Sequence, residues 1–137
     1  MILIDTGYLI AILDVRDELH ARAVRWSRFI NESVLVTTPV LIEAVNHFSG
    51  SPLRSSMRVL IRRLEEAQEC EIVHLGPDLL AAGLTLHQTR DDKQWSLTDC
   101  ISFALMEQRG INRALAFDRH FEQAGFVPLL RMEPTGS

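Results

Sequence analysis

The chain has 137 residues, enough for one domain with a buried core, and its two cysteines, Cys70 and Cys100, provide no disulfide framework. The formal net charge of −4 argues against a large, sequence-independent electrostatic hold on nucleic acid. It leaves a nuclease open because catalytic carboxylates are themselves negative. No apolar run approaches the roughly 20 residues that span a bilayer, and the N-terminus does not have a signal-peptide pattern. The two cysteines without a disulfide framework favour a reducing, cytoplasmic location.

Short apolar runs that predict strands alternate with segments of helical periodicity. In chain order, we expect a strand over residues 1–5, a short helix ending at 13, a helix over 18–31, a strand over 34–37 and a helix ending near 49. We then expect helix 53–68, strand 71–75, helix 77–90, helix 96–110, strand 113–117, helix 120–124 and strand 126–130. Thr38-Pro39 is interpreted as an N-cap followed by a proline at the first helical position.

The alternation of strands and helices predicts βαβ units and a parallel sheet with both faces covered. No segment between them has the composition of a domain linker. We therefore expect an α/β fold in one domain over residues 1–131, followed by a loose tail over 132–137.

Two acidic residues follow predicted strands, and ligands of parallel sheets bind at the carboxyl ends of the strands. Asp5 follows the first apolar run and Asp118 follows Ala114-Leu115-Ala116-Phe117. If they lie close together, their charges repel by about a few kcal/mol unless a cation lies between them. The alternative for each is the ordinary role of a helix N-cap.

Two further acids lie near the start of predicted helices. Glu43 is the only charge in Val40-Leu41-Ile42-Glu43-Ala44-Val45, where it either faces solvent or points at a cation. Asp99 follows Ser96 by three residues, which resembles a capping box and would explain it without catalysis.

Four segments together resemble the PIN-domain ribonucleases, especially the small VapC-type toxins of prokaryotic toxin–antitoxin pairs. These segments are Ile2-Leu3-Ile4-Asp5-Thr6, Thr38-Pro39 leading to Glu43, Trp95-Ser96-Leu97-Thr98-Asp99-Cys100, and Phe117-Asp118-Arg119-His120-Phe121. The resemblance runs nearly end to end, and the segments around Asp99 and Asp118 are its most specific parts.

The resemblance implies a three-layer α/β/α fold with a central, mainly parallel sheet of four to five strands and Mg²⁺ or Mn²⁺ in an acidic pocket. It implies that the catalytic and metal-binding acids are Asp5, Glu43, Asp99 and Asp118. Thr6 and Ser96 match hydroxyl positions that help to orient a carboxylate or water. Two residues depart from the family pattern: Gly7 stands where Asn or Ser is frequent, and Ala116 stands where many members carry Thr.

Hard divalent cations prefer oxygen ligands, and such an ion activates water and neutralises phosphoryl charge. We therefore expect in-line hydrolysis of RNA that leaves a 5′-phosphate and a 3′-hydroxyl. The resemblance further implies a small antitoxin partner, whose tail lies in or near the pocket with an Arg in the metal's place, and a homodimer.

Three other functional classes stay open. The first is a catalytically silent PIN-like module that binds RNA or a partner. The second is a phosphatase or other metal hydrolase, although Gly7 fills the third position of the Asp-x-Asp pair common in such enzymes. The third is an aspartic protease, suggested by Asp5-Thr6-Gly7 but opposed by the long helical periodicities.

Overall fold

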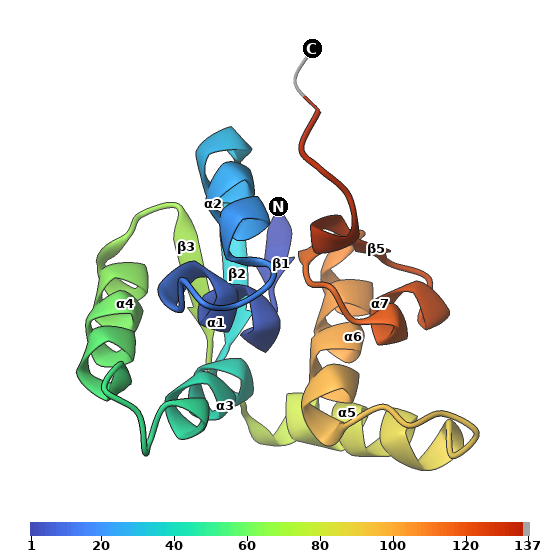
Figure 1. Cartoon of the computed structure of the whole chain (residues 1–137). Helices are drawn as coiled ribbons and strands as arrows, with labels where there is room; N and C mark the ends of the chain where they lie inside the picture. Colours follow the sequence, from blue (N-terminus) through green and yellow to red (C-terminus); the bar gives the residue numbers. More distant parts are fainter. Residues whose placement is uncertain (136–137) are drawn as a thin grey trace.

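A parallel sheet of five short strands lies at the centre of the structure, a computed structural model that describes residues 1–135 (Figure 1). Its strands are β1 (Ile2–Ile4), β2 (Val34–Thr37), β3 (Cys70–Val73), β4 (Arg113–Leu115) and β5 (Val127–Pro128). They lie in the order β3-β2-β1-β4-β5, and every neighbouring pair is parallel. The predicted α/β class and the predicted parallel sheet are therefore confirmed.

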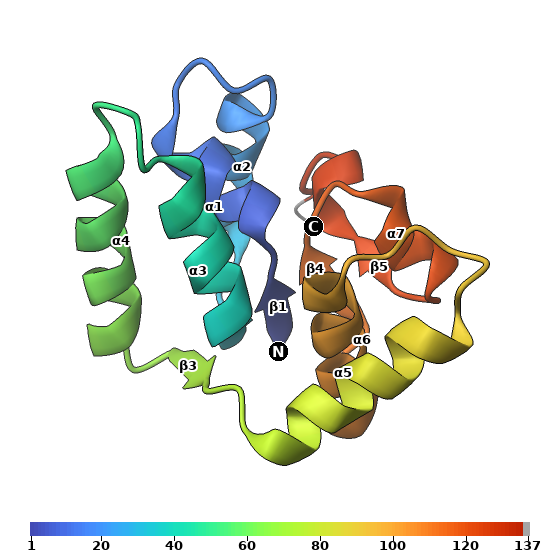
Figure 2. The ribbon, with the colours of Figure 1, turned by 90° about the horizontal axis from the view of Figure 1, so that it is seen from below.

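Helices cover both faces of this sheet. They are α1 (Thr6–Leu13), α2 (His20–Phe29), α3 (Thr38–His47), α4 (Arg54–Glu66), α5 (Pro77–Thr89), α6 (Leu97–Arg109) and α7 (Arg119–Gln123). Helices α1–α4 lie on one side and α5–α7 on the other, with β1 and β4 between them (Figure 2). The three-layer α/β/α arrangement is thus present.

The alternation of side chains along the strands divides the apolar core into two layers. In β1, Ile2 and Ile4 pack with α1–α4, whereas Leu3 packs with α5–α7. In β4, Leu115 belongs to the first layer and Ala114 to the second. Because both faces of the sheet are buried, the central strands read as continuous apolar runs in the sequence.

The helix that follows β2 begins one residue earlier than the sequence indicated. Thr37, not Thr38, is the N-cap of α3, and its side chain accepts a hydrogen bond from the backbone N–H of Val40. The hydroxyl of Thr38 instead accepts a hydrogen bond from the backbone N–H of Leu75 at 3.0 Å. Thr38 therefore ties the start of α3 to the chain that leaves β3.

The last predicted strand, over residues 126–130, is wrong in its length. Only Val127–Pro128 pairs with β4, and residues Leu129–Arg131 form a 3₁₀ turn. Pro128 has no N–H with which to extend the ladder, and Leu130 instead donates its N–H to the carbonyl of Ala116. The apolar run was read as a strand because a short buried 3₁₀ turn has the same composition.

The chain beyond residue 131 contacts α2 as far as residue 133. Trp26 Nε1 donates a hydrogen bond to the carbonyl of Met132 at 2.8 Å, and Arg25 pairs with Glu133 at 2.6 Å. The loose tail expected over 132–137 stays a prediction, and its residues 136–137 lie outside the described part. Within residues 1–135, no helix has both the length and the apolarity to cross a membrane.

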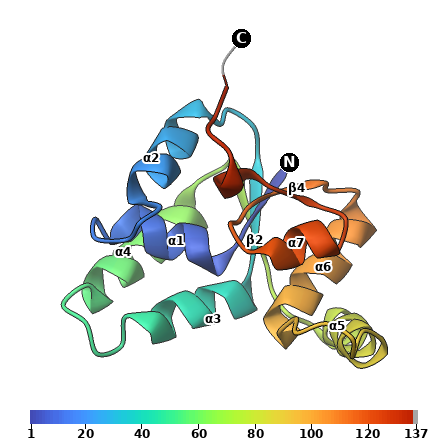
Figure 3. The same ribbon diagram turned by 45° about the vertical axis from the view of Figure 1, so that its right-hand side comes forward.

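The order of the strands places a crevice between β1 and β4. From β1 the chain moves outward through β2 to β3, and it then returns to the other side of β1 for β4 and β5. Strand order therefore reverses at β1 and β4, and ligands of open parallel sheets bind outside the carboxyl ends of the strands at such a point. In Figure 3, α7 lies beside α6, next to the place where the strand order reverses.

Candidate active site

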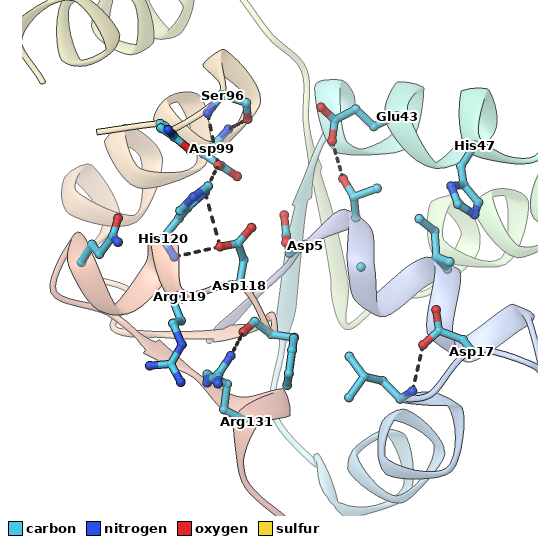
Figure 4. Close-up of a pocket in the computed structure, with 17 residues that line it drawn as sticks. Asp5, Asp17, Glu43, His47, Ser96, Asp99, Asp118, Arg119, His120 and Arg131 are labelled. Carbon is cyan, nitrogen blue, oxygen red and sulfur yellow. Dashed lines mark hydrogen bonds and ion pairs between the residues drawn. The ribbon is translucent and has the colours of Figure 1, made fainter. Parts of the chain in front are cut away.

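One open cavity of about 1040 Å³ lies at the carboxyl ends of β1 and β4. All four acids selected from the sequence line it, namely Asp5, Glu43, Asp99 and Asp118. Figure 4 shows Asp5 at the centre, with Glu43 on one side and Asp99 and Asp118 on the other. The structure therefore brings together side chains that lie as far apart in the sequence as residues 5 and 118.

Asp5 stands between β1 and α1, at the N-cap position of the helix. Its backbone is extended (φ −98°, ψ 164°), and its N–H bonds to the carbonyl of Leu115 in β4. Its carboxylate makes no capping hydrogen bond. Capping therefore does not account for Asp5, and the carboxylate faces the cavity.

Asp118 is the N-cap of α7, so the capping alternative is correct for this residue. Its Oδ1 accepts a hydrogen bond from the backbone N–H of His120 at 2.9 Å. The side chain is nevertheless half exposed and lines the cavity. A carboxylate has several lone pairs, so a cap of this kind leaves it able to bind another group.

Asp99 forms the capping box that the sequence suggested. Ser96 Oγ accepts a hydrogen bond from the N–H of Asp99 at 3.0 Å, and Asp99 Oδ2 accepts one from the N–H of Ser96 at 3.3 Å. The same Oδ2 lies 3.0 Å from His120 Nδ1, which is also 3.4 Å from Asp118 Oδ1. His120 therefore connects Asp99 on α6 to Asp118 on the turn before α7.

Glu43 is exposed on α3 and is oriented by a hydroxyl from α1. Its Oε1 accepts a hydrogen bond from Thr6 Oγ1 at 2.9 Å. Thr6 and Ser96, the two hydroxyl residues selected from the sequence, are thus each bonded to one of the four acids. Their roles in binding or catalysis stay predictions.

The environment of Asp5 favours its protonated form. Burial and the neighbouring charges of Asp99, Glu43 and Asp118 raise the pKa of its carboxyl to about 7, against a lowering by the nearby backbone N–H of Thr6. Burial is the largest cause because it removes water from the charged form. A cation in this cavity would stabilise the carboxylate and relieve the repulsion.

The donor chemistry of the cavity fits a hard divalent cation, since carboxylate oxygens are the ligands that Mg²⁺, Mn²⁺ and Ca²⁺ prefer. The raised pKa of Asp5 is the structural sign that positive charge would be stabilising there. However, no group of three or more His, Cys, Asp or Glu side chains among residues 1–135 is arranged to hold an ion as it stands. Binding would therefore require these side chains to shift toward one another, and the carboxylates of Glu43, Asp99 and Asp118 each keep a second oxygen that is not bonded to Thr6 or His120.

The two departures from the family pattern differ in their surroundings. Gly7 lines the cavity, and a Cβ built on it would meet nothing within 4 Å. Ala116, directly after β4, is fully buried in the second core layer. The site thus has room at Gly7 for the missing polar side chain, whereas Ala116 belongs to the core.

Several lining residues were not predicted for the site. They are Ile10, Asp17, Leu19, His47, Gln94, Phe117, Arg119, Gln123 and Arg131. Phe117 and Arg119 flank Asp118 in the sequence, which was the available signal for them. Arg131 had none, because it lies just past the strand predicted over 126–130, in a 3₁₀ turn that the sequence did not indicate.

The comparison with protein families matches residues 2–127 to the PIN domain. The curated 23S rRNA-specific endonuclease VapC20 of Mycobacterium tuberculosis, from strains H37Rv and CDC 1551, is 31% identical over 130 residues. The alignment covers 93% of this chain and 96% of that protein.

Solved structures give the same fold. The crystal structure of M. tuberculosis VapC20, described as a sarcin–ricin loop cleaving toxin, has a TM-score of 0.86 at 26% identity, covering 94% of this chain and 98% of that one. FitAcB from Neisseria gonorrhoeae has a TM-score of 0.64 at 20% identity, covering 93% and 98%. A toxin–antitoxin complex from Klebsiella pneumoniae has a TM-score of 0.60 at 14% identity, covering 82% and 83%; these last two show the fold alone.

Proposed function

This chain belongs to the PIN-domain family, and we propose that it is an endoribonuclease toxin whose four clustered carboxylates bind a divalent cation. The observation that carries the proposal is the convergence of Asp5, Glu43, Asp99 and Asp118 on one cavity at the switch point of the sheet. PIN-domain nucleases generally use divalent metal ions. We propose Mg²⁺ or Mn²⁺ for this chain because its donors are carboxylate oxygens.

A divalent cation held by these carboxylates would neutralise charge on the phosphoryl oxygens and lower the pKa of a bound water. Thr6 orients Glu43 through its hydroxyl, and His120 holds Asp99 and Asp118 through Nδ1. These contacts limit the rotation of carboxylates that would otherwise repel one another.

Arg119 and Arg131 are the cationic side chains that line the cavity. Both lie on the α7 side of the site, and Arg119 is exposed with no ion-pair partner within 4.0 Å among residues 1–135. We assign Arg119 to the phosphates of the substrate, because a guanidinium group binds phosphate oxygens in pairs. Nη1 and Nε of Arg131 are already engaged by the Phe117 carbonyl and by Glu122.

The reaction that follows is hydrolysis of an RNA phosphodiester. The oxygen of a water attacks phosphorus in line with the 3′ oxygen, the bond from phosphorus to the 3′ oxygen breaks, and that oxygen takes a proton. The products are a 5′-phosphate and a 3′-hydroxyl. The relative VapC20 bears the name of a 23S rRNA-specific endonuclease, so a structured ribosomal RNA loop is the first substrate to try.

The proposed partner is a small antitoxin protein with a basic segment that enters the acidic cavity. The carboxylates there would attract such a segment electrostatically. A homodimer and a cytoplasmic location complete the proposal; the location rests on two free cysteines, one half-buried and one buried.

The decisive experiment is cleavage of end-labelled RNAs by protein freed of any co-purified partner. The substrates are a sarcin–ricin loop hairpin and an unstructured RNA, each tested with Mg²⁺, with Mn²⁺ and with chelator. We expect metal-dependent cleavage that is lost in Asp5→Asn and Asp99→Asn. The matched control is Asp91→Asn, because Asp91 is exposed and lies outside the cavity lining.

A catalytically silent PIN-like module is the second candidate. It is favoured by one observation, that His120 contacts both Asp99 and Asp118 while no three ligands are assembled. Metal binding without cleavage of any RNA in the panel would select this module. Absence of metal binding would remove both candidates and leave the carboxylates as caps and surface charges.

A further inference from the structure

We propose that the ring of Phe117, backed by the guanidinium of Arg131, is a platform on which an unpaired RNA base stacks beside the bond to be cut. The inference rests on the proposed ribonuclease function and specifies which feature of the RNA the site would read.

Phe117 is unusual among the exposed apolar residues of the chain. Its side chain is 40% exposed, and within residues 1–135 it is the one large exposed apolar side chain that lines the carboxylate cavity. The other aromatic with comparable exposure, Phe29 at 45%, lies on α2 outside the cavity. Phe117 is therefore the exposed aromatic surface that this acidic cavity offers to a ligand.

Arg131 holds this aromatic residue in place. Its guanidinium carbon lies 4.4 Å from the centroid of the Phe117 ring, and its Nη1 donates a hydrogen bond to the Phe117 carbonyl at 2.9 Å. Its Nε in turn pairs with Glu122 at 3.4 Å. Ring and guanidinium are therefore ordered before any ligand arrives, which lowers the entropic cost of stacking a third group.

The platform adjoins the proposed chemistry. Phe117 is the residue before Asp118, so a base stacked on its ring belongs to a nucleotide next to the carboxylates. Arg119, on the other side of Asp118, is exposed and lines the same cavity. Aromatic stacking flanked by guanidinium groups is how proteins hold single-stranded nucleic acid.

The occupant must be a base that is not stacked within a helix. Both faces of a base in an A-form duplex are covered by its neighbours, whereas bases of loops, bulges and single strands can turn outward onto an aromatic side chain. A protein side chain could also stack on Phe117. RNA is favoured because the same cavity carries the carboxylates and two guanidinium groups.

The test combines two changes, one in the protein and one in the RNA. Phe117→Leu keeps the bulk of the side chain and removes its aromatic face, and Phe117→Trp keeps an aromatic face. The substrate is a hairpin RNA that the wild-type protein cleaves, prepared with its normal bases and with a single abasic nucleotide at each position flanking the cut. The measured quantity is kcat/KM for each combination of protein variant and RNA substrate.

We expect Phe117→Leu to lower kcat/KM on the intact hairpin by about 5- to 150-fold, the range that corresponds to the loss of one base–aromatic stack. Phe117→Trp should retain most of the activity. At one abasic position the loss should largely disappear, because the stacked base is already missing, and this non-additivity identifies a direct contact. The control, Phe29→Leu, should cleave every substrate like the wild type.

Two results would overturn the inference while leaving the ribonuclease function intact. One is wild-type cleavage by Phe117→Leu. The other is an equal loss on intact and abasic RNAs at every position, which would mean that Phe117 only positions Asp118. If the wild-type protein cleaves no RNA in the panel, the ribonuclease function itself fails, and the inference fails with it.

Discussion

His120 and Asp99 meet in the site although they lie 21 residues apart in the sequence, with Nδ1 of the imidazole 3.0 Å from Oδ2 of the carboxylate. The contact joins α7 to the first turn of α6. Because Asp99 also takes part in the capping box of α6, its carboxylate is fixed from two sides. Loss of a side chain that orients a metal ligand in this way commonly lowers metal affinity or activity by about 10- to 100-fold.

Removal of the imidazole should therefore weaken the site without removing a carboxylate. We expect His120→Ala to lower metal affinity and kcat/KM by about 10- to 100-fold. His120→Asn should retain more of both, because the Asn amide nitrogen can donate from nearly the position of Nδ1. The measurements are metal titration by calorimetry and cleavage of a labelled hairpin. Equal activity of His120→Ala and the wild type would show that the contact has no orienting role.

The raised pKa of Asp5 predicts a stability that falls as the pH rises in metal-free protein. The carboxyl titrates at about 7 in the folded chain and near 3.8 in the unfolded chain. Between these values the folded state holds a proton that the unfolded state has lost, so each unit of rising pH lowers the free energy of unfolding by up to about 1.4 kcal/mol. Above pH 7 the free energy of unfolding has fallen by the full amount that Asp5 contributes, and it falls no further on account of this residue.

Asp5→Asn removes this cost, so its advantage in stability over the wild type should grow by a few kcal/mol between pH 5 and pH 8. Urea denaturation in the presence of chelator measures it. Asp91→Asn, an exposed carboxylate outside the cavity, should show no such pH-dependent difference. A difference for Asp5→Asn that stays constant or shrinks as the pH rises would contradict the assignment.

Divalent cations should stabilise the wild-type protein more at pH 8 than at pH 5, because protons compete with the ion for Asp5. At a concentration one hundred times its Kd, an ion that binds only the folded chain adds about 2.7 kcal/mol. Thermal unfolding with Mn²⁺ and with chelator at both pH values measures the effect. If Mn²⁺ raised the unfolding temperature of Asp5→Asn as much as that of the wild type at pH 8, the ion would be bound elsewhere.

Loss of the Ser96 hydroxyl should destabilise the start of α6. Ser96→Ala removes the acceptor for the N–H of Asp99 at 3.0 Å, which should cost about 0.5–2 kcal/mol of stability. Ser96→Thr should restore most of it. Ser55→Ala, an exposed serine on α4, is the matched control and should be nearly neutral. Equal urea midpoints for Ser96→Ala and Ser55→Ala would show that the Ser96 hydroxyl does not stabilise the start of α6.

Gly83 should resist replacement although it lies within a helix. A Cβ there would come within 2.6 Å of Ile101 Cγ1 and 3.3 Å of the Ile101 backbone, where α5 crosses α6. We expect the overpacking in Gly83→Ala to cost about 1–3 kcal/mol of stability, offset in part by a gain in helix propensity of about 1 kcal/mol. Gly7→Ala, whose Cβ meets nothing within 4 Å, should show only the gain. Equal urea midpoints for the two variants would mean that α5 and α6 separate without cost.

The sequence predicted most of this structure because its signals are local. Apolar runs located the strands, Ser96 located the start of α6, and the four acids were found to share one cavity. The contacts that organise the cavity depend instead on distant segments meeting in space. The bridge from His120 to Asp99 and the stacking of Arg131 on Phe117 have no periodic signature in the chain. Their roles can be assigned only after the fold is known.

The position of β1 at the middle of the sheet has a consequence for synthesis on the ribosome. β1 is made before the other four strands, yet one of its two neighbours, β4, is made only after β2 and β3. A nascent chain that has not reached residue 113 lacks both β4, which borders the crevice, and the carboxylate of Asp118. The proposed site therefore stays incomplete on the ribosome until β4 and Asp118 have been made, and the proposed cleavage of RNA cannot begin before then.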